Sequence, residues 1–106
     1  MSTRQGFALH TLAARDITEL WEYIAQQSPA SARRIREEIL STIRALVPFP
    51  LRGHLRPDLT SRPLRFILVR DYLIAYAPDE NPLWVIAFLH GRRNPRVMAS
   101  TLRGRG

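Results

Sequence analysis

Arginine and histidine side chains in the C-terminal half are the groups of this chain that could do chemistry. Arg65 lies in a run of otherwise apolar residues that reads as a strand, so its charge needs an explanation. A planar guanidinium could bind a carboxylate or a phosphate through two parallel hydrogen bonds. The alternative is that Arg65 lies at a sheet edge or faces solvent.

A basic cluster follows the last apolar run, in the segment HGRRNP from His90 to Pro95. A histidine beside two arginines could bind an anion, or it could act as an acid or base on RNA. The alternative is a polar strand end that stays hydrated.

Several other chemistries are excluded by composition and spacing. The chain has no cysteine, which rules out disulfides, thiolate metal sites and a cysteine nucleophile, and which fits a reducing compartment. Its histidines, His10, His54 and His90, are too far apart in sequence to suggest a set of metal ligands. The glycines form no phosphate-binding loop, and no serine lies in a nucleophile elbow. We therefore predict no metal and no cofactor.

The positive charge of the chain is concentrated in its second part. The 106 residues carry 16 arginines, no lysine and nine acids, for a net charge of +7. Residues 1–47 hold six arginines and five acids, whereas residues 48–106 hold ten arginines and four acids. This asymmetry predicts one surface for an anionic partner, either nucleic acid or an acidic protein segment. A genome composition that favours arginine explains the missing lysine equally well.

The length and apolar runs limit the architecture to one small domain over residues 1–106. No apolar run approaches the roughly 20 residues that a membrane-spanning helix needs. The first residues show no secretory signal. We therefore expect a cytoplasmic protein.

Two amphipathic helices are predicted in the first part. Apolar residues recur at steps of three and four up to about Gln27, with Thr11 as the expected N-cap. Ser28 and Pro29 then suit the cap and first position of a second helix, because proline fits a helix start and cannot continue the first helix. So short a connection makes the helices fold back as a hairpin.

Strands are predicted on both sides of this hairpin. A short strand is expected at residues 7–9, and three runs at 64–69, 72–77 and 83–90 are close enough to pair as an antiparallel meander. The order β-α-α-β-β-β predicts an α+β domain with the hairpin packed on one face of a small, mainly antiparallel sheet. Residues 97–106 are expected to form a short helix or a flexible tail with a frayed end.

Taken in order, these features resemble the ParE branch of the RelE/ParE superfamily, the toxins of bacterial type II toxin–antitoxin systems. The resemblance runs from about Phe7 to Pro95. It is carried by Ala14 to Ile17 and Tyr23 to Ala25, Ser28-Pro29 with Ala32, Leu46 to Gly53, Leu64-Arg65, Asp71 to Ile74 with Tyr76, and Leu89 to Arg93. The family's fold is a helical hairpin on an antiparallel sheet, which agrees with the elements predicted above.

The resemblance implies two different activities. RelE-like members are ribosome-dependent endoribonucleases, and for that chemistry this chain could offer Arg65, His90 and Arg92, with Tyr76 as a further candidate. Gly91 follows His90 where some RNA-cleaving relatives have a tyrosine, and no acid is an obvious base. ParE-like members poison DNA gyrase without covalent chemistry. The segment after His90 looks more like that branch, so a gyrase poison that is not an enzyme is favoured.

The resemblance also implies a partner, a ParD-like ribbon-helix-helix antitoxin whose acidic C-terminal segment wraps the toxin. The residues expected to bind it are Arg56, Arg65, Arg70, Trp21 and Ile24, with apolar anchors in the groove between hairpin and sheet. Acidic segments of this kind usually order on binding.

The residues expected to contact the target are His90, Arg92, Arg93 and Arg96. Deleting the chain from Pro95 onward should then abolish toxicity and keep antitoxin binding. A plain nucleic-acid-binding module remains as a third hypothesis, suggested by the net charge alone. We expect no sequence-specific DNA binding, because the arginines are not interleaved with stacking aromatics.

Overall fold

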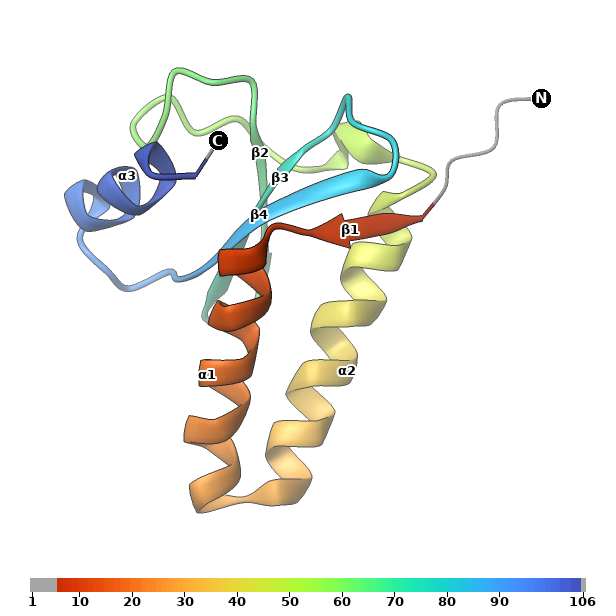
Figure 1. Ribbon diagram of the computed structural model, residues 1–106, viewed down its shortest axis with the longest axis vertical. Coiled ribbons are helices and arrows are strands. Elements are labelled where there is room, and N and C mark those ends of the chain that lie inside the picture. Colours follow the sequence, from red (N-terminus) through yellow and green to blue (C-terminus); the bar gives the residue numbers. More distant parts are fainter. Residues whose placement is uncertain (1–5, 106) are drawn as a thin grey trace.

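A computed structural model describes residues 6–105, in which one small sheet lies between a helical hairpin and a third helix (Figure 1). The elements follow in the order β1 (Phe7–Leu9), α1 (Thr11–Gln27), α2 (Pro29–Leu46), the short 3-10 helix η1 (Pro50–Arg52), β2 (Arg65–Val69), β3 (Tyr72–Ala77), β4 (Leu83–His90) and α3 (Pro95–Arg103). The α+β fold and the order β-α-α-β-β-β are confirmed, and α3 follows as a further element.

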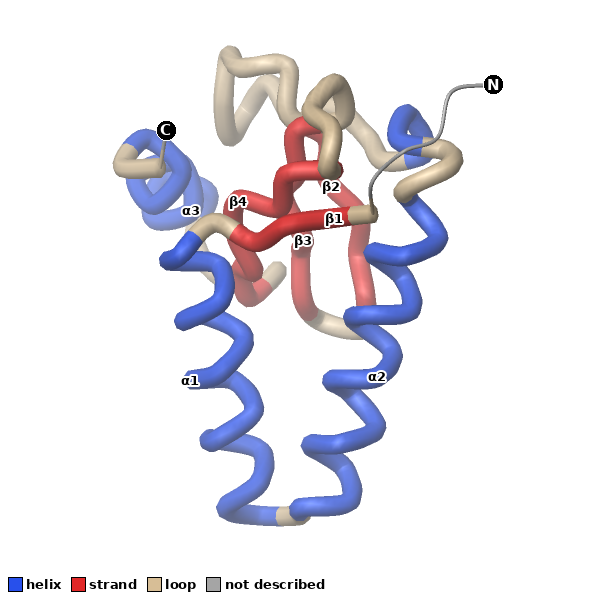
Figure 2. Tube along the Cα trace, turned by 45° about the vertical axis from the view of Figure 1, so that its right-hand side comes forward, coloured by secondary structure: helices blue, strands red, loops and turns tan. Residues whose placement is uncertain are grey.

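The two long helices run antiparallel and meet at a turn that projects away from the sheet (Figure 2). Ser28 caps α2, because its Oγ accepts a hydrogen bond from the Ser31 N–H at 3.2 Å, and Pro29 opens the helix as predicted. The cap of α1 is His10, whose Nδ1 accepts from the Leu12 N–H at 3.0 Å. The prediction of Thr11 as the cap was therefore wrong by one residue.

The sheet has the strand order β1-β4-β3-β2. The last three strands form the predicted antiparallel meander, whereas β1 pairs in parallel with β4 through Phe7↔Leu83 to Leu9↔Val85. The register between β3 and β4 shifts by one residue, from Ala75↔Ala87 to Tyr76↔Val85, so Ile86 is the extra residue of a β-bulge.

Both faces of the sheet are buried. The hairpin covers one face, where Ile39 and Ile43 of α2 pack with Ile74, Val85 and other strand residues. On the other face, Leu59 from the loop before β2 and Met98 and Leu102 from α3 pack on residues of β2, β3 and β4. The predicted one-sided packing is therefore completed by a second apolar layer.

The C-terminal segment is part of this second layer. The helix offered for residues 97–106 is confirmed and begins at Pro95. A frayed end was the other expectation, but Arg105 is only 8% exposed and binds side-chain and backbone groups of α1 and β4. The sequence alone does not reveal this contact, because its acidic partner is 89 residues away.

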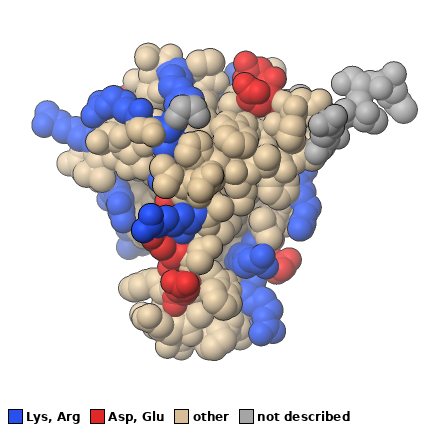
Figure 3. All heavy atoms as spheres, in the orientation of Figure 1, with Lys and Arg blue, Asp and Glu red and all other residues tan. Residues whose placement is uncertain are grey.

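Charge is distributed differently over the two ends of the molecule. In the face shown in Figure 3, arginine atoms gather on the side of α3, while basic and acidic atoms are interspersed along the hairpin. This distribution matches the near-neutral first part and the basic second part of the sequence.

Within the described residues 6–105, no helix is long and apolar enough to cross a membrane. No group of three or more histidine, aspartate or glutamate side chains there is arranged to hold a metal ion.

Candidate functional site

A groove of about 470 Å³ lies where β4 ends, between α1 and α3. Leu20 from α1 and Phe88 from β4 contribute apolar surface. Its polar lining includes Tyr23 from α1, Tyr72 from β3, and His90 and Arg93 from the end of β4 and the loop after it. The fold therefore brings together side chains from four separate segments.

His90 is held in place at the rim of this groove. It lies opposite Tyr72 in the β3–β4 ladder, and the two rings meet edge to face with centroids 5.4 Å apart. Its Nδ1 accepts a hydrogen bond from the Arg92 N–H at 3.2 Å. In the neutral ring, that bond leaves Nε2 as the nitrogen that carries the proton and can donate.

Two tyrosines, Tyr23 and Tyr72, contribute hydroxyl groups to the groove. Burial raises the pKa of Tyr72 above its ordinary 10.0, and the nearby Asp71 and Tyr23 add to this effect. Tyr23 is 64% exposed, so its hydroxyl is accessible to a ligand. Both residues were absent from the predicted site, because a tyrosine in a helix or strand has no sequence signal for binding.

The structure places two of the four expected target-binding residues in the groove, His90 and Arg93. Arg92 lies 3.6 Å from Asp71, with both side chains largely exposed. Arg96 is exposed in the first turn of α3, where its N–H donates to the Asn94 cap at 2.8 Å. The expected set is therefore divided between the groove and the surface beside it.

An ion pair between Asp16 and Arg105 closes one end of the groove. The Arg105 guanidinium donates to both carboxylate oxygens of Asp16 and to the Ile86 carbonyl at 3.0 Å. Asp16 also accepts from the Phe88 N–H at 3.1 Å. The side chains of Arg105 and Asp16 are 9% and 20% exposed. Arg105 thus provides a hydrogen-bond donor for the carbonyl of Ile86, which the β-bulge leaves without a partner in the β3–β4 ladder.

Arg65 lies on β2, an edge strand of the sheet, as one of the sequence hypotheses expected, and it has a further role that neither hypothesis contained. Its guanidinium donates to the backbone carbonyls of Leu51 and Gly53, at 3.2 and 2.8 Å. The buried Tyr76 holds the same loop, since its hydroxyl donates to the Pro50 carbonyl at 2.7 Å and accepts from the Gly53 N–H at 2.9 Å. Both side chains therefore fix the loop after α2 against the sheet.

Replacing Tyr76 by phenylalanine should lower the free energy of unfolding by about 1–3 kcal/mol, because two backbone groups lose their partner. Burial raises the pKa of Tyr76 above 10.0. In the unfolded chain, the Tyr76 phenol therefore loses its proton at a lower pH than in the folded chain. The free energy of unfolding of the wild-type chain should fall as the pH rises above about 10. The Tyr76→Phe variant has no phenol at this position and should lack this part of the pH dependence. Urea unfolding from pH 8 to 11 measures both effects, with the exposed Tyr23→Phe as the control.

The candidate nuclease residues are not brought together. Arg65 pairs with Tyr76, whereas His90 pairs with Tyr72 at the other end of β3. Tyr72 and Tyr76 are four residues apart in an extended strand, which places them about 13 Å from each other. Arg92 lies near His90, but Tyr76, the further candidate, is fully buried beneath the loop.

Comparison with known protein families decides the relationship. A family model described as the ParE toxin of the type II toxin–antitoxin system parDE matches residues 7–95. The chain belongs to the ParE toxin family. A search of curated proteins gives no significant match. As a ParE-family toxin, the chain is one half of a toxin–antitoxin pair, so an antitoxin is its expected partner.

Two of the arginines expected to bind the antitoxin already have acidic partners within this ParE-family chain. Arg70 donates to Glu38 of α2 through Nε at 2.9 Å and through a second, shorter contact. That hydrogen bond lowers the pKa of Glu38. Arg56 binds Asp58 through two hydrogen bonds of 2.9 and 2.8 Å. These pairs are exposed, so an acidic partner could exchange with them at little cost.

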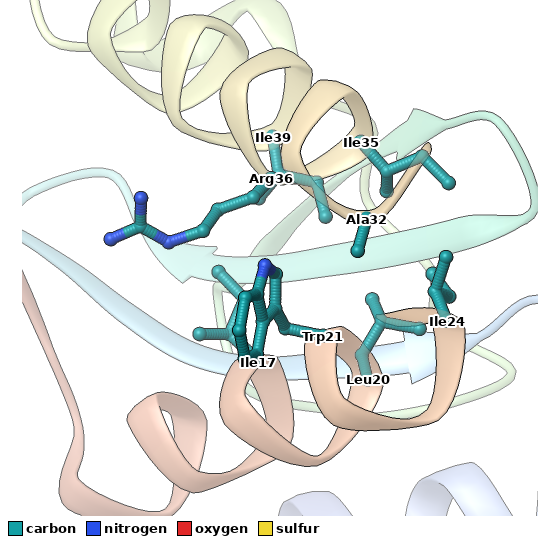
Figure 4. Close-up of a pocket in the computed structure, with 8 residues that line it drawn as sticks. All are labelled: Ile17, Leu20, Trp21, Ile24, Ala32, Ile35, Arg36 and Ile39. Carbon is teal, nitrogen blue, oxygen red and sulfur yellow. The ribbon is translucent and has the colours of Figure 1, made fainter. Parts of the chain in front are cut away.

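The apolar residues of the expected antitoxin set lie between the two helices of the ParE-family hairpin (Figure 4). Trp21 and Ile24 of α1 face Arg36 and Ile35 of α2 across this gap. Trp21 remains 43% exposed. An exposed indole beside aliphatic side chains is the composition of an interface anchor.

Proposed function

We propose that this ParE-family toxin poisons DNA gyrase in the bacterial cytoplasm and that a ParD-like ribbon-helix-helix antitoxin neutralises it. The observation that favours this over RNA cleavage is the separation of Arg65 from His90. A nuclease needs its anion-binding arginine and its acid or base within reach of one phosphate. Here the guanidinium of Arg65 is engaged by two backbone carbonyls at the opposite end of the sheet.

The groove at the end of β4 is the proposed contact surface for the target. His90, Arg93 and the two tyrosine hydroxyls offer donors from a fixed framework, and no covalent step is needed. Tyrosine and arginine side chains are also the types that contribute most to protein interfaces. Arg92 and Arg96 would add positive charge at the rim and speed association.

Inducible expression in bacteria distinguishes the two activities. The gyrase proposal predicts DNA breaks and induction of the SOS response before translation slows. Rapid translational arrest with cut mRNA would instead support the nuclease. Arg93→Glu should abolish growth inhibition, whereas Arg33→Glu on the exposed surface of α2 should leave it intact. Equal toxicity of both variants would remove the groove from the proposal.

Antitoxin binding provides a separate prediction. Arg70→Glu places an acid beside Glu38 and should weaken binding to the antitoxin by about tenfold. The expected loss is that of one charge pair between Arg70 and an antitoxin carboxylate, which contributes about 1.4 kcal/mol or more when it is buried in the interface. Arg65 is a poor position for this test because it also holds the loop. Isothermal titration of toxin with antitoxin at two salt concentrations measures the effect, and Arg44→Glu serves as the control. An unchanged affinity for Arg70→Glu would place the acidic segment elsewhere.

A further inference from the structure

The edge of β4 extends well beyond its neighbour β1. β1 contributes only Phe7–Leu9 and pairs with Leu83–Val85, whereas β4 continues to His90. The chain leaves the sheet after Leu9 to begin α1, which lines the groove beside the second half of β4 with residues between Asp16 and Tyr23 but does not pair with it as a strand. The second half of β4 therefore has no neighbouring strand on this side within the described part of the chain.

Side chains cover the first groups of this open edge. The Ile86 carbonyl accepts from Arg105, and the Phe88 N–H donates to Asp16. In an antiparallel ladder, the N–H and carbonyl of one residue point to the same side, and residues two apart share that direction. The Phe88 carbonyl and the His90 N–H therefore point away from β3, and both residues line the groove.

Around these backbone groups, the available side chains are donors. Arg93 and the hydroxyls of Tyr23 and Tyr72 lie in the groove. The acids on the α1 side are engaged within the chain, since Asp16 binds Arg105 and Glu19 binds Arg15 at 3.1 Å. The groove thus combines an edge that can accept and donate one backbone hydrogen bond with side chains that favour a negatively charged occupant.

We propose that an extended, acidic segment of a protein partner binds in this groove as a short added strand on β4. Its backbone would donate to the Phe88 carbonyl and accept from the His90 N–H. Its carboxylates would face Arg93 and the tyrosine hydroxyls, and apolar side chains on the other face would pack on Leu20 and Phe88. This mode of recognition is the addition of a strand to an open sheet edge.

Charge decides against a second copy of the same chain as the occupant. A net charge of +7 opposes self-association, and arginine atoms gather on the side of α3 in the face shown in Figure 3. The inference deepens the proposed function, because it names the chemistry of the partner at the residues assigned to target contact. It is tested on the isolated chain, so it can fail while gyrase poisoning stands, and the reverse also holds.

The probe is an acetylated and amidated hexapeptide of alternating glutamate and valine, added to the 15N-labelled full chain. Amide hydrogen exchange, read by NMR, should slow at His90 when the peptide binds. The Phe88 amide, already bonded to Asp16, should change little and serves as a control in the same spectrum. Unchanged exchange at His90 at saturating peptide would overturn the proposal, as would protection confined to the hairpin or to β2.

Matched peptides test the backbone contact itself. In a strand, only alternate N–H groups face the neighbouring strand. Of two peptides N-methylated on all glutamates or on all valines, one should bind about tenfold more weakly and the other about as well as the parent. Equal binding of the two would exclude strand addition. A short duplex DNA that protects His90 better than the peptide would assign the groove to nucleic acid and overturn the proposal.

A charge reversal tests the side-chain contacts. Arg93→Glu should bind the glutamate–valine peptide at least tenfold more weakly and should prefer a lysine–valine peptide. Arg93 is exposed, so the fold should persist. Arg33→Glu carries the same change in net charge on α2 and should bind as the wild type. A similar loss for both variants would show that only net charge matters and would contradict the assignment of this groove.

Discussion

Replacing Asp16 by alanine is expected to lower the free energy of unfolding by about 3–5 kcal/mol. The substitution leaves the nearly buried guanidinium of Arg105 without its counter-charge. It also removes the acceptor of the Phe88 N–H. Since small domains are stable by only about 5–15 kcal/mol, the change is a large part of the total. Urea unfolding followed by circular dichroism measures it.

Glu19→Ala is the matched control for this variant. Glu19 lies three residues further along α1 and pairs with Arg15, but those side chains are 64% and 73% exposed. Its removal should cost about 0–1 kcal/mol. Replacing Asp16 and Arg105 together by leucine should recover part of the loss, because no unpaired charge then remains. If Asp16→Ala and Glu19→Ala were equally stable, the ion pair would have no special structural role.

A chain that ends at Asn94 is expected to lose its cooperative fold. Met98 and Leu102 are 2% and 1% exposed and form part of the second apolar layer. Truncating a single buried side chain of this size to alanine costs about 2–5 kcal/mol, and the deletion removes both together with Arg105. Thermal unfolding should show no sharp transition and near-ultraviolet circular dichroism should be weak.

Val97→Ala provides the control for this deletion, because Val97 belongs to the same helix but is 46% exposed. It should unfold within about 0.5 kcal/mol of the wild type. A truncated chain with a sharp transition near that of the full chain would contradict the assignment of α3 to the core. The structure also changes the meaning of the deletion test proposed from sequence. Lost toxicity would follow from unfolding, so Arg93→Glu is the sharper test of the target surface.

The fold could be predicted where the signal is local. Apolar spacing gives both helices, and Ser28 with Pro29 gives the turn between them, because caps and proline act over a few residues. The meander follows from short connections between its strands. The parallel pairing of β1 with β4 joins residues about 76 positions apart, as in Leu9↔Val85. No local pattern determines which strand such a segment joins.

The candidate site was predicted only in part, for the same reason. His90 and Arg93 stood out because the segment around them is rich in charge. Asp16 was not among the candidate site residues, and Arg105 was part of the end that was expected to be frayed. Their contact joins residues at opposite ends of the chain, so it is visible only in three dimensions. For Arg65, the predicted position at a sheet edge is confirmed, but a contact with backbone carbonyls of a loop was not considered.

The parallel pairing of β1 with β4 also orders the events of synthesis. β1 and α1 leave the ribosome before β4, yet β1 can join the sheet only when Val85 has been made, and Asp16 receives its counter-charge only with Arg105. At typical elongation rates, roughly 4 to 15 s separate Leu9 from Val85. The groove, which needs α1, β4 and α3 together, therefore forms only after α3 has been synthesised, long after α1.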